Sequence, residues 1–356
     1  MKLKIVLAFF LISLVSNSQI SVGARHVGGK KSFSKGVLDK LKATETIFIL
    51  SNVYDKDTYE NLLKDTWTIT PYKLISFEDF KIEDYLNDAY SFVELGGHIK
   101  IKEPKYGGGA ITRLYTYIDF KMYDNTSIIE AKTKLSDKKW KKNKRKVFSS
   151  NTIKIARIYL FQKEDLITNA ANFSVFDSYD NIRNEVKTSP EYVEKVINML
   201  YNKDVFFNYK KGYLKNYFQK LNTLIDDEQT YWMYEEDYTP ELKQLQTKKL
   251  YIPSYLTVKY NGFTIEDMPN TNAYIDELFN KYTFDYEVIS DEELNDKIMQ
   301  NEELYYLRYV RMNNERFIQI VNSKNGEIVY RNYLTGLSYN IKSKNIKQIN
   351  DKIKKL

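Results

Sequence analysis

The chain has 356 residues, of which 43% are hydrophobic and 28% charged, a composition typical of a folded protein rather than a disordered one. It contains no cysteine and two histidines, which excludes disulfides, a lipid anchor on cysteine and the usual Cys/His zinc site. The formal net charge of +7 is mildly basic and selects no class of partner.

Residues 1–18 have the three-part order of a secretory signal peptide. Lys2 and Lys4 precede an apolar run from Ile5 to Val15, and small polar residues follow. The run has about half of the roughly 20 residues that a membrane-spanning helix needs. We therefore expect cleavage after Ser18 and a periplasmic or secreted protein, with no transmembrane segment in the mature chain.

Changes in composition and hydrophobic pattern divide the rest of the chain into four segments. They are a flexible lead-in rich in Gly, Ser and Lys at 19–42, a first α/β unit at 43–165, a helical connector at 166–247 and a second α/β unit at 248–356. In the first unit we expect buried strands at Thr46–Leu50 and Tyr72–Ser76. Between them Tyr59, Leu63 and Trp67 recur every four residues, which is the spacing of one helix face.

The second unit repeats the sequence pattern of the first. YKLISFEDFKIED at 72–84 corresponds to YEVISDEELNDKI at 286–298. Hydrophobic order also agrees between AYSFVEL and ELYYLRY, between RLYTYIDF and RFIQIVNS, and between NTSIIEA and NGEIVYR. We interpret this as an internal duplication. The predicted fold class is α/β, with two duplicated β-α-β-α-β-β units whose parallel crossovers and antiparallel hairpins form mixed sheets.

Ser76 and Ser290 mark the point in each copy where a strand gives way to a helix. A carboxylate, Asp79 or Glu293, follows three residues later, as in a capping box. The repeated phrase therefore predicts a helix start, worth about 1 kcal/mol at each cap. In the connector, apolar spacing and cap residues predict helices at Ser189–Tyr201, Gly212–Asp226 and Thr239–Gln246.

This order of elements resembles the N-terminal domain of TolB and the curli-export lipoprotein family, and also uncharacterised secreted α/β proteins of Gram-negative bacteria. The resemblance covers the repeated units and implies a protein exported to the cell envelope. The chain lacks the anchor cysteine of the lipoproteins, and no β-propeller repeats follow as in TolB.

The sequence offers few residues for catalysis. His26 lies in the lead-in and His98 in a glycine-rich hairpin, where we expect an exposed loop residue. Gly107–Gly109 lack the spacing of a phosphate-binding loop. We therefore predict no catalytic residue, no metal site and no cofactor.

The sharpest compositional feature is the basic run DKKWKKNKRK at 137–146. Because like charges repel, we expect a solvated loop between strands, either without a partner or in contact with anionic lipid or glycan headgroups. The predicted site residues are Lys138, Lys139, Trp140, Lys141, Lys142, Lys144, Arg145 and Lys146.

The second candidate site is the acidic and aromatic stretch DDEQTYWMYEEDY at 226–238. Two carboxylates beside aromatic rings, here Glu235 and Asp237, are what a glycosidase or a sugar-binding cleft needs. The alternatives are a metal site, although the DxDxDG spacing of a calcium loop is missing, and an acidic loop whose aromatic rings pack on the core.

The leading hypothesis is a non-catalytic exported binding or assembly module at the cell envelope, with an envelope protein or an anionic glycan or lipid surface as partner and no nucleic acid. The alternative is a secreted glycan hydrolase using Glu235 and Asp237. The hydrolase requires the two carboxyl groups roughly 5–10 Å apart in an open cleft.

Overall fold

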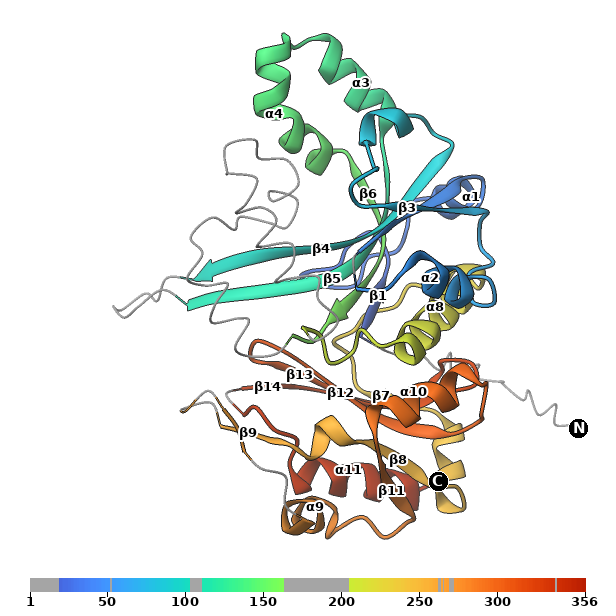
Figure 1. Cartoon of the computed structure of the whole chain (residues 1–356), viewed down its shortest axis with the longest axis vertical. Helices are drawn as coiled ribbons and strands as arrows, with labels where there is room; N and C mark the ends of the chain where they lie inside the picture. The colour runs from blue at the N-terminus through green and yellow to red at the C-terminus, as the bar shows by residue number, and fades with distance from the viewer. Residues whose placement is uncertain are drawn as a thin grey trace, which may run out of the picture.

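The structure is a computed structural model that describes residues 19–356 except 52, 103–110, 163–204, 262–263, 265, 269–271 and 337. The predicted signal peptide and the predicted helix at Ser189–Tyr201 lie outside the described residues, as do Gly107–Gly109. The described chain forms two six-stranded mixed sheets with helices packed on them (Figure 1). The predicted α/β class is confirmed.

The first sheet has the strand order β1-β6-β5-β4-β2-β3. Its strands are β1 (Ile20–Val22), β2 (Glu45–Leu50), β3 (Tyr72–Ser76), β4 (Tyr90–Lys102), β5 (Ile111–Tyr123) and β6 (Thr152–Leu160). The helices of this unit are α1 (Val37–Lys42), α2 (Lys56–Leu63), the 3₁₀-helix η1 (Ile82–Tyr85), α3 (Asn125–Thr133) and α4 (Asp137–Ser150).

The second sheet has the order β11-β8-β12-β13-β14-β7. Its strands are β7 (Asp237–Tyr238), β8 (Leu250–Pro253), β11 (Tyr286–Ile289), β12 (Tyr305–Met312), β13 (Glu315–Asn322) and β14 (Ile328–Thr335). The other elements are α8 (Lys211–Asp226), η2 (Pro240–Gln246), η3 (Ser254–Thr257), the hairpin β9 (Lys259–Asn261) and β10 (Glu266–Met268), α9 (Asn272–Phe279), α10 (Asp291–Met299) and α11 (Ser343–Lys354).

The two sheets have the same topology. Reading from one edge, β3-β2-β4-β5-β6-β1 corresponds to β11-β8-β12-β13-β14-β7, with parallel pairs at the start and antiparallel pairs after them in both. Even the irregularity is shared, because the ladder shifts register between Phe120 and Lys121 in β5 and between Ile320 and Val321 in β13. When the paired residues are followed from strand to strand in each sheet, the two register shifts fall at equivalent positions. The sheets are therefore built as copies of one scaffold.

The expectation of a flexible lead-in is wrong for its described part. Ile20 pairs with Ile158 as β1 adds an edge strand to the first sheet, and Gln19, Ser21 and His26 are fully buried. Gly23 has a φ of +149°, and a Cβ there would lie 2.6 Å from the carbonyl oxygen of Lys31. This glycine therefore allows a close backbone approach and does not mark a flexible segment.

The two predicted caps differ in outcome. Ser290 Oγ accepts from Glu293 N at 3.1 Å and α10 begins there, as predicted. Ser76 Oγ accepts from Asp79 N at 3.2 Å, but only a turn and the short helix η1 follow. Phe80 packs on Phe92 and Tyr85, with ring centroids 6.0 and 5.5 Å away. Tertiary packing of these rings overrides the local helix signal.

The segment Asn125–Ala131, which the sequence aligns with NGEIVYR at the start of β14, belongs instead to the helix α3. Asp124 caps this helix, accepting from Ser127 N at 3.2 Å, and β6 forms the missing strand further along the chain.

The connector helix α8 lies between the two sheets (Figure 1). It covers the predicted Gly212–Asp226, and the predicted helix at Thr239–Gln246 forms as η2. Phe218 packs on Phe48 and Phe120 of the first sheet, while Tyr213 stacks on Tyr306 of the second at 5.4 Å. One hydrophobic core therefore joins both units through α8.

Candidate functional site

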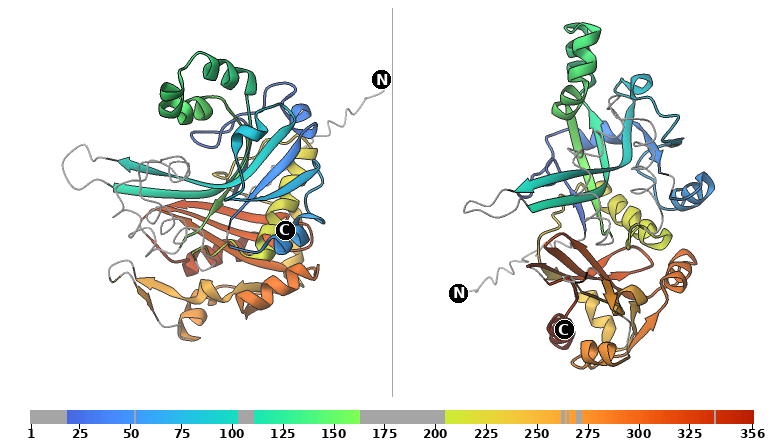
Figure 2. Two further views of the ribbon diagram at one scale, coloured as in Figure 1. Left: turned by 45° about the horizontal axis from the view of Figure 1, so that its top comes forward. Right: turned by 60° about the vertical axis from the view of Figure 1, so that its left-hand side comes forward.

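Comparison of the two copies reveals a large addition to the first unit. In the second unit β13 and β14 are joined by residues 323–327, a tight turn with Gly326 at a φ of +71°. In the first unit the equivalent strands β5 and β6 are separated by residues 124–151, of which 125–150 form the helical hairpin α3–α4. The hairpin stands away from the sheets at one end of the molecule (Figures 1 and 2).

This hairpin concentrates the positive charge of the protein. Residues 125–150 contain nine Lys or Arg residues and two carboxylates, Glu130 and Asp137. Their formal charge therefore equals the +7 of the whole chain, and the remaining residues are neutral overall.

The basic run is a helix and not the loop that we expected. Trp140, Val147 and Phe148 share one face of α4 at helical spacing, and Trp140 is only 9% exposed. Its ring lies 6.2 Å from that of Phe148, which in turn meets the ring of Tyr123 at 5.2 Å. Trp140 therefore belongs to the core, and its contact with an anionic surface stays a prediction for which little of the ring is exposed. On a helix the lysine side chains point into water in different directions, which weakens the repulsion between their charges. The run of like charges therefore does not require a loop.

The outward side of α4 carries the ammonium groups. We define the basic ridge as the exposed residues Lys138, Lys139, Lys141, Lys142 and Lys146. The described residues place no carboxylate within ion-pair distance of these five side chains. Lys144 instead turns inward and pairs with Glu83 beside η1. Arg145 lies in α4, with its side chain outside the described residues.

The ridge continues onto α3. Lys132 is exposed, with its ammonium 6.0 Å from the centroid of the Trp140 ring, while Lys134 pairs with Glu130 at 3.2 Å. Ile129 on the same helix is 44% exposed.

The acidic candidate site has a different character. Arg331 of β14 holds Asp237 with two hydrogen bonds, Nε to Oδ1 at 2.8 Å and Nη2 to Oδ2 at 3.1 Å. Nη2 also donates to Glu235 Oε2 at 3.2 Å, and Nη1 donates to the carbonyl of Trp232 at 3.0 Å. The Arg331 side chain is 2% exposed. One buried guanidinium thus binds both carboxylates that a hydrolase would need free.

Electrostatics at this pair act in two directions. Burial, together with the nearby Glu235 carboxylate, raises the pKa of Asp237 to about 7. The bidentate guanidinium favours the charged carboxylate and opposes that shift.

The segment that carries these carboxylates connects the edges of the two sheets. Tyr231 exchanges backbone hydrogen bonds of 2.8 Å with Val22 of β1, and Asp237 and Tyr238 then form β7 on the second sheet. The Tyr234 ring packs between these points on Phe317. We call residues 231–238 the strap, and its acidic and aromatic residues serve this connection.

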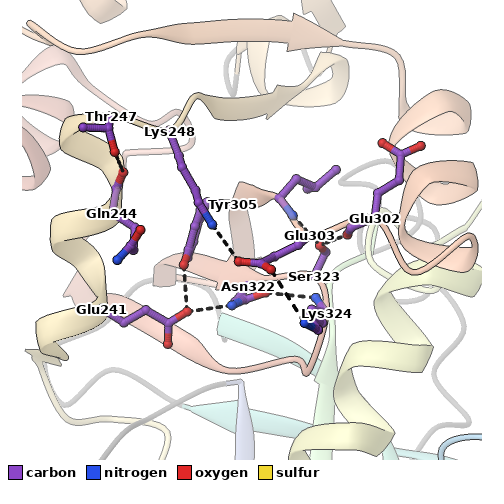
Figure 3. A network of polar contacts seen from close by, with 11 residues as sticks. Glu241, Gln244, Thr247, Lys248, Glu302, Glu303, Tyr305, Asn322, Ser323 and Lys324 are labelled. Carbon is purple, nitrogen blue, oxygen red and sulfur yellow. Dashed lines mark hydrogen bonds and ion pairs between the residues drawn. The ribbon is translucent and has the colours of Figure 1, made fainter.

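A polar network that the sequence did not reveal fixes η2 to the second sheet (Figure 3). Glu241 accepts from Tyr305 Oη at 2.8 Å and from Asn322 Nδ2 at 2.6 Å. Lys248 and Glu303 form an ion pair of 2.6 Å nearby. Burial and the Glu241 carboxylate raise the pKa of Tyr305. Because the acceptors and donors satisfy one another, this network is best explained as structural.

The first unit has a small cavity beside the end of β2. Its polar lining includes Glu94, which pairs with Lys121, and a hydroxyl cluster in which Tyr59 Oη lies 2.8 Å from both Ser51 Oγ and Tyr209 Oη. The cavity volume is about 30 Å³, room for one or two waters and not for a substrate.

Other predicted positions add no chemistry. His98 lies in β4 opposite Tyr115, and its side chain is outside the described residues. Within the described ranges, no three His, Asp or Glu side chains are grouped to hold a metal ion. No helix in that part of the chain is long and apolar enough to cross a bilayer. No family model, curated protein or solved structure matches the chain.

Proposed function

We propose that the protein is an exported, non-catalytic binding module of the cell envelope, and that the basic ridge docks on anionic lipid headgroups. The observation that carries this proposal is the α3–α4 hairpin. It is present in one of the two copies of the scaffold, and it holds a formal charge equal to that of the whole chain.

The geometry supports a surface as partner in preference to a single extended chain. The ridge lysines lie on the exposed side of α4, and the described part of the chain gives them no carboxylate partner. The apolar side of α4 is already used by Trp140 and Phe148 in the core. The helix therefore cannot insert into a bilayer as an amphipathic anchor does, and attraction to headgroups must be electrostatic.

The expected affinity is modest. Each lysine near an anionic leaflet contributes about 1 kcal/mol, so the five ridge lysines give about 5 kcal/mol and submillimolar binding. Binding of this kind weakens within the Debye length as salt rises. Several copies on one surface, or a second contact, would be needed for stable attachment.

Vesicle sedimentation tests the proposal. The mature protein should bind phosphatidylglycerol vesicles at low salt, release them as salt is raised, and ignore phosphatidylcholine vesicles. Replacing the five ridge lysines with glutamine should abolish binding. A matched control replaces five exposed lysines elsewhere, Lys56, Lys73, Lys243, Lys281 and Lys354.

Equal loss of binding in both variants would show that net charge, and not the ridge, is responsible. Binding to an acidic glycan with none to vesicles would replace lipid with glycan as the partner. Absence of binding to either would overturn the proposal.

A further inference from the structure

Gln19 occupies an unusual place for a residue that follows a signal peptide. It is 0% exposed, and its carbonyl accepts from Tyr159 N at 3.1 Å as β1 joins the sheet. Its side-chain Oε1 accepts from Tyr217 Oη and, at 3.4 Å, from Asn208 Nδ2. Its Nε2 is buried and meets no hydrogen-bond partner among the described residues. A buried donor without a partner is costly, about 1–3 kcal/mol.

The neighbourhood of Gln19 already contains a buried cation. The Tyr217 ring lies 4.3 Å from the guanidinium carbon of Arg308, which is 1% exposed. The side-chain hydrogen bonds of Arg308 go to the neutral Gln319 Oε1, at 3.0 and 2.9 Å, and its Nη1 has no partner. The described residues place no carboxylate in ion-pair contact with it.

Cleavage after Ser18 would leave a charged α-amino group at Gln19. Gln19 is fully buried, so that ammonium would be desolvated, and Tyr217, which donates to the Gln19 side chain, also lies against the buried guanidinium of Arg308. A buried charge without a counter-ion is strongly unfavourable. The folded state therefore favours a neutral N-terminus.

We infer that Gln19 is a modification site that cyclises to pyroglutamate when the mature chain is formed, an inference that rests on the proposed export. The α-amino nitrogen attacks Cδ of the side-chain amide. The N–Cδ bond forms, the Cδ–Nε2 bond breaks, and Nε2 leaves as ammonia with a hydrogen from the amine. Nothing is oxidised or reduced. The atom that leaves is the unpartnered Nε2, and the retained oxygen is the hydrogen-bonded Oε1.

Cyclisation should precede docking of β1, because in the folded chain the side-chain amide is held by Tyr217 and Asn208 and is not free to meet the amine. The lactam then enters the core as a neutral cap, and the charge at this end of the chain is lost.

The test is the intact mass and N-terminal sequence of the protein exported through its own leader. We expect a chain beginning at Gln19 whose mass is lower than encoded by one ammonia. The Gln19→Asn variant, which cannot close the five-membered lactam, should keep its encoded mass and a reactive amine. It should also unfold at a lower urea concentration than the wild type.

Each other outcome counts against the inference. An open amine on Gln19 in the freshly purified protein would overturn cyclisation while leaving export intact. A lactam that accumulates only during storage would do the same. A chain that begins at another residue would overturn both cyclisation and the proposed cleavage, while vesicle binding would remain a separate test of the ridge.

Discussion

Arg157 and Arg331 occupy the same position in the two sheets but find their carboxylates on opposite sides. Arg157 binds Asp119 on the inner strand β5, at 2.9 and 3.1 Å. Arg331 faces Gln319 at the position equivalent to Asp119, and it binds Asp237 on the edge strand β7 instead. Both copies have an arginine at this position, but its carboxylate partner lies on the neighbouring strand on one side in the first sheet and on the other side in the second.

The pairing of Arg331 with Asp237 predicts that replacing this one carboxylate with an amide strongly destabilises the protein. Asp237→Asn leaves a guanidinium that is 2% exposed with a weakened partner, and we expect a loss of about 3 kcal/mol in the free energy of unfolding. Urea unfolding measures it. Glu236→Gln, at an exposed neighbouring position, should change stability by less than about 0.5 kcal/mol. If both variants were equally stable, the strap would not depend on this pair.

A histidine makes stability depend on pH. Burial lowers the pKa of His26 from 6.5 to about 4, with Arg157 and Lys154 adding to the shift and Asp119, 3.8 Å away, opposing it. Between these two pH values the unfolded chain binds a proton that the folded chain does not. The folded state therefore loses stability as pH falls through this window, by about 3 kcal/mol from this residue.

The measurement is the urea midpoint of the wild type and of His26→Gln at pH 7 and at pH 4.5. The wild type should lose more stability than the variant between the two. The carboxylates titrate equally in the wild type and in the variant. An identical loss of stability in both proteins would therefore show that His26 is not the cause.

Gly326 predicts a backbone clash. A Cβ at this position would lie 2.2 Å from the carbonyl oxygen of Asn216 in α8, on a backbone with φ of +71°. Gly326→Ala should therefore destabilise the protein by more than the roughly 1 kcal/mol of the left-handed backbone alone. Gly336→Ala is the control, because its φ is +127° while the nearest atom is 3.8 Å from the added Cβ. Equal losses in thermal unfolding would mean that contact with α8 is unimportant.

The hairpin predicts a separation of stability from binding. Trp140→Ala should cost about 3 kcal/mol or more, because it empties part of the core under α4. Glutamine at the five ridge lysines should leave the urea midpoint unchanged, since these side chains are exposed and form no ion pair with the residues that the structure describes. A destabilised ridge variant would make its loss of vesicle binding uninterpretable as a surface effect, and would count against the ridge as a site.

Apolar periodicity was enough to predict the parts of the fold that bury one face. The alternation around Tyr72–Ser76, the helical spacing of α8 and the repeated phrase at 286–298 all depend on local side-chain order. Strands β1 and β7 could not be predicted from the sequence, because Ile20–Val22 and Asp237–Tyr238 are too short to show alternation.

The candidate sites were harder to predict because they depend on register across strands. In the sequence, nothing relates Asp237 to Arg331, which lie 94 residues apart. The basic run was recognised as a feature, but its lysines concealed the helical spacing of Trp140, Val147 and Phe148. The spacing of apolar residues therefore predicted a helix only where charged residues did not outnumber them.

The edge strand β1 sets where a usable fragment of the first unit must begin. A fragment started at residue 43 would leave β6 with an unpaired backbone edge, beside Ala156 and Ile158, which are fully buried in the whole chain. Such an edge recruits strands from other molecules. Fragments that begin at residue 43 should aggregate, whereas those that retain Ile20–Val22 should stay monodisperse.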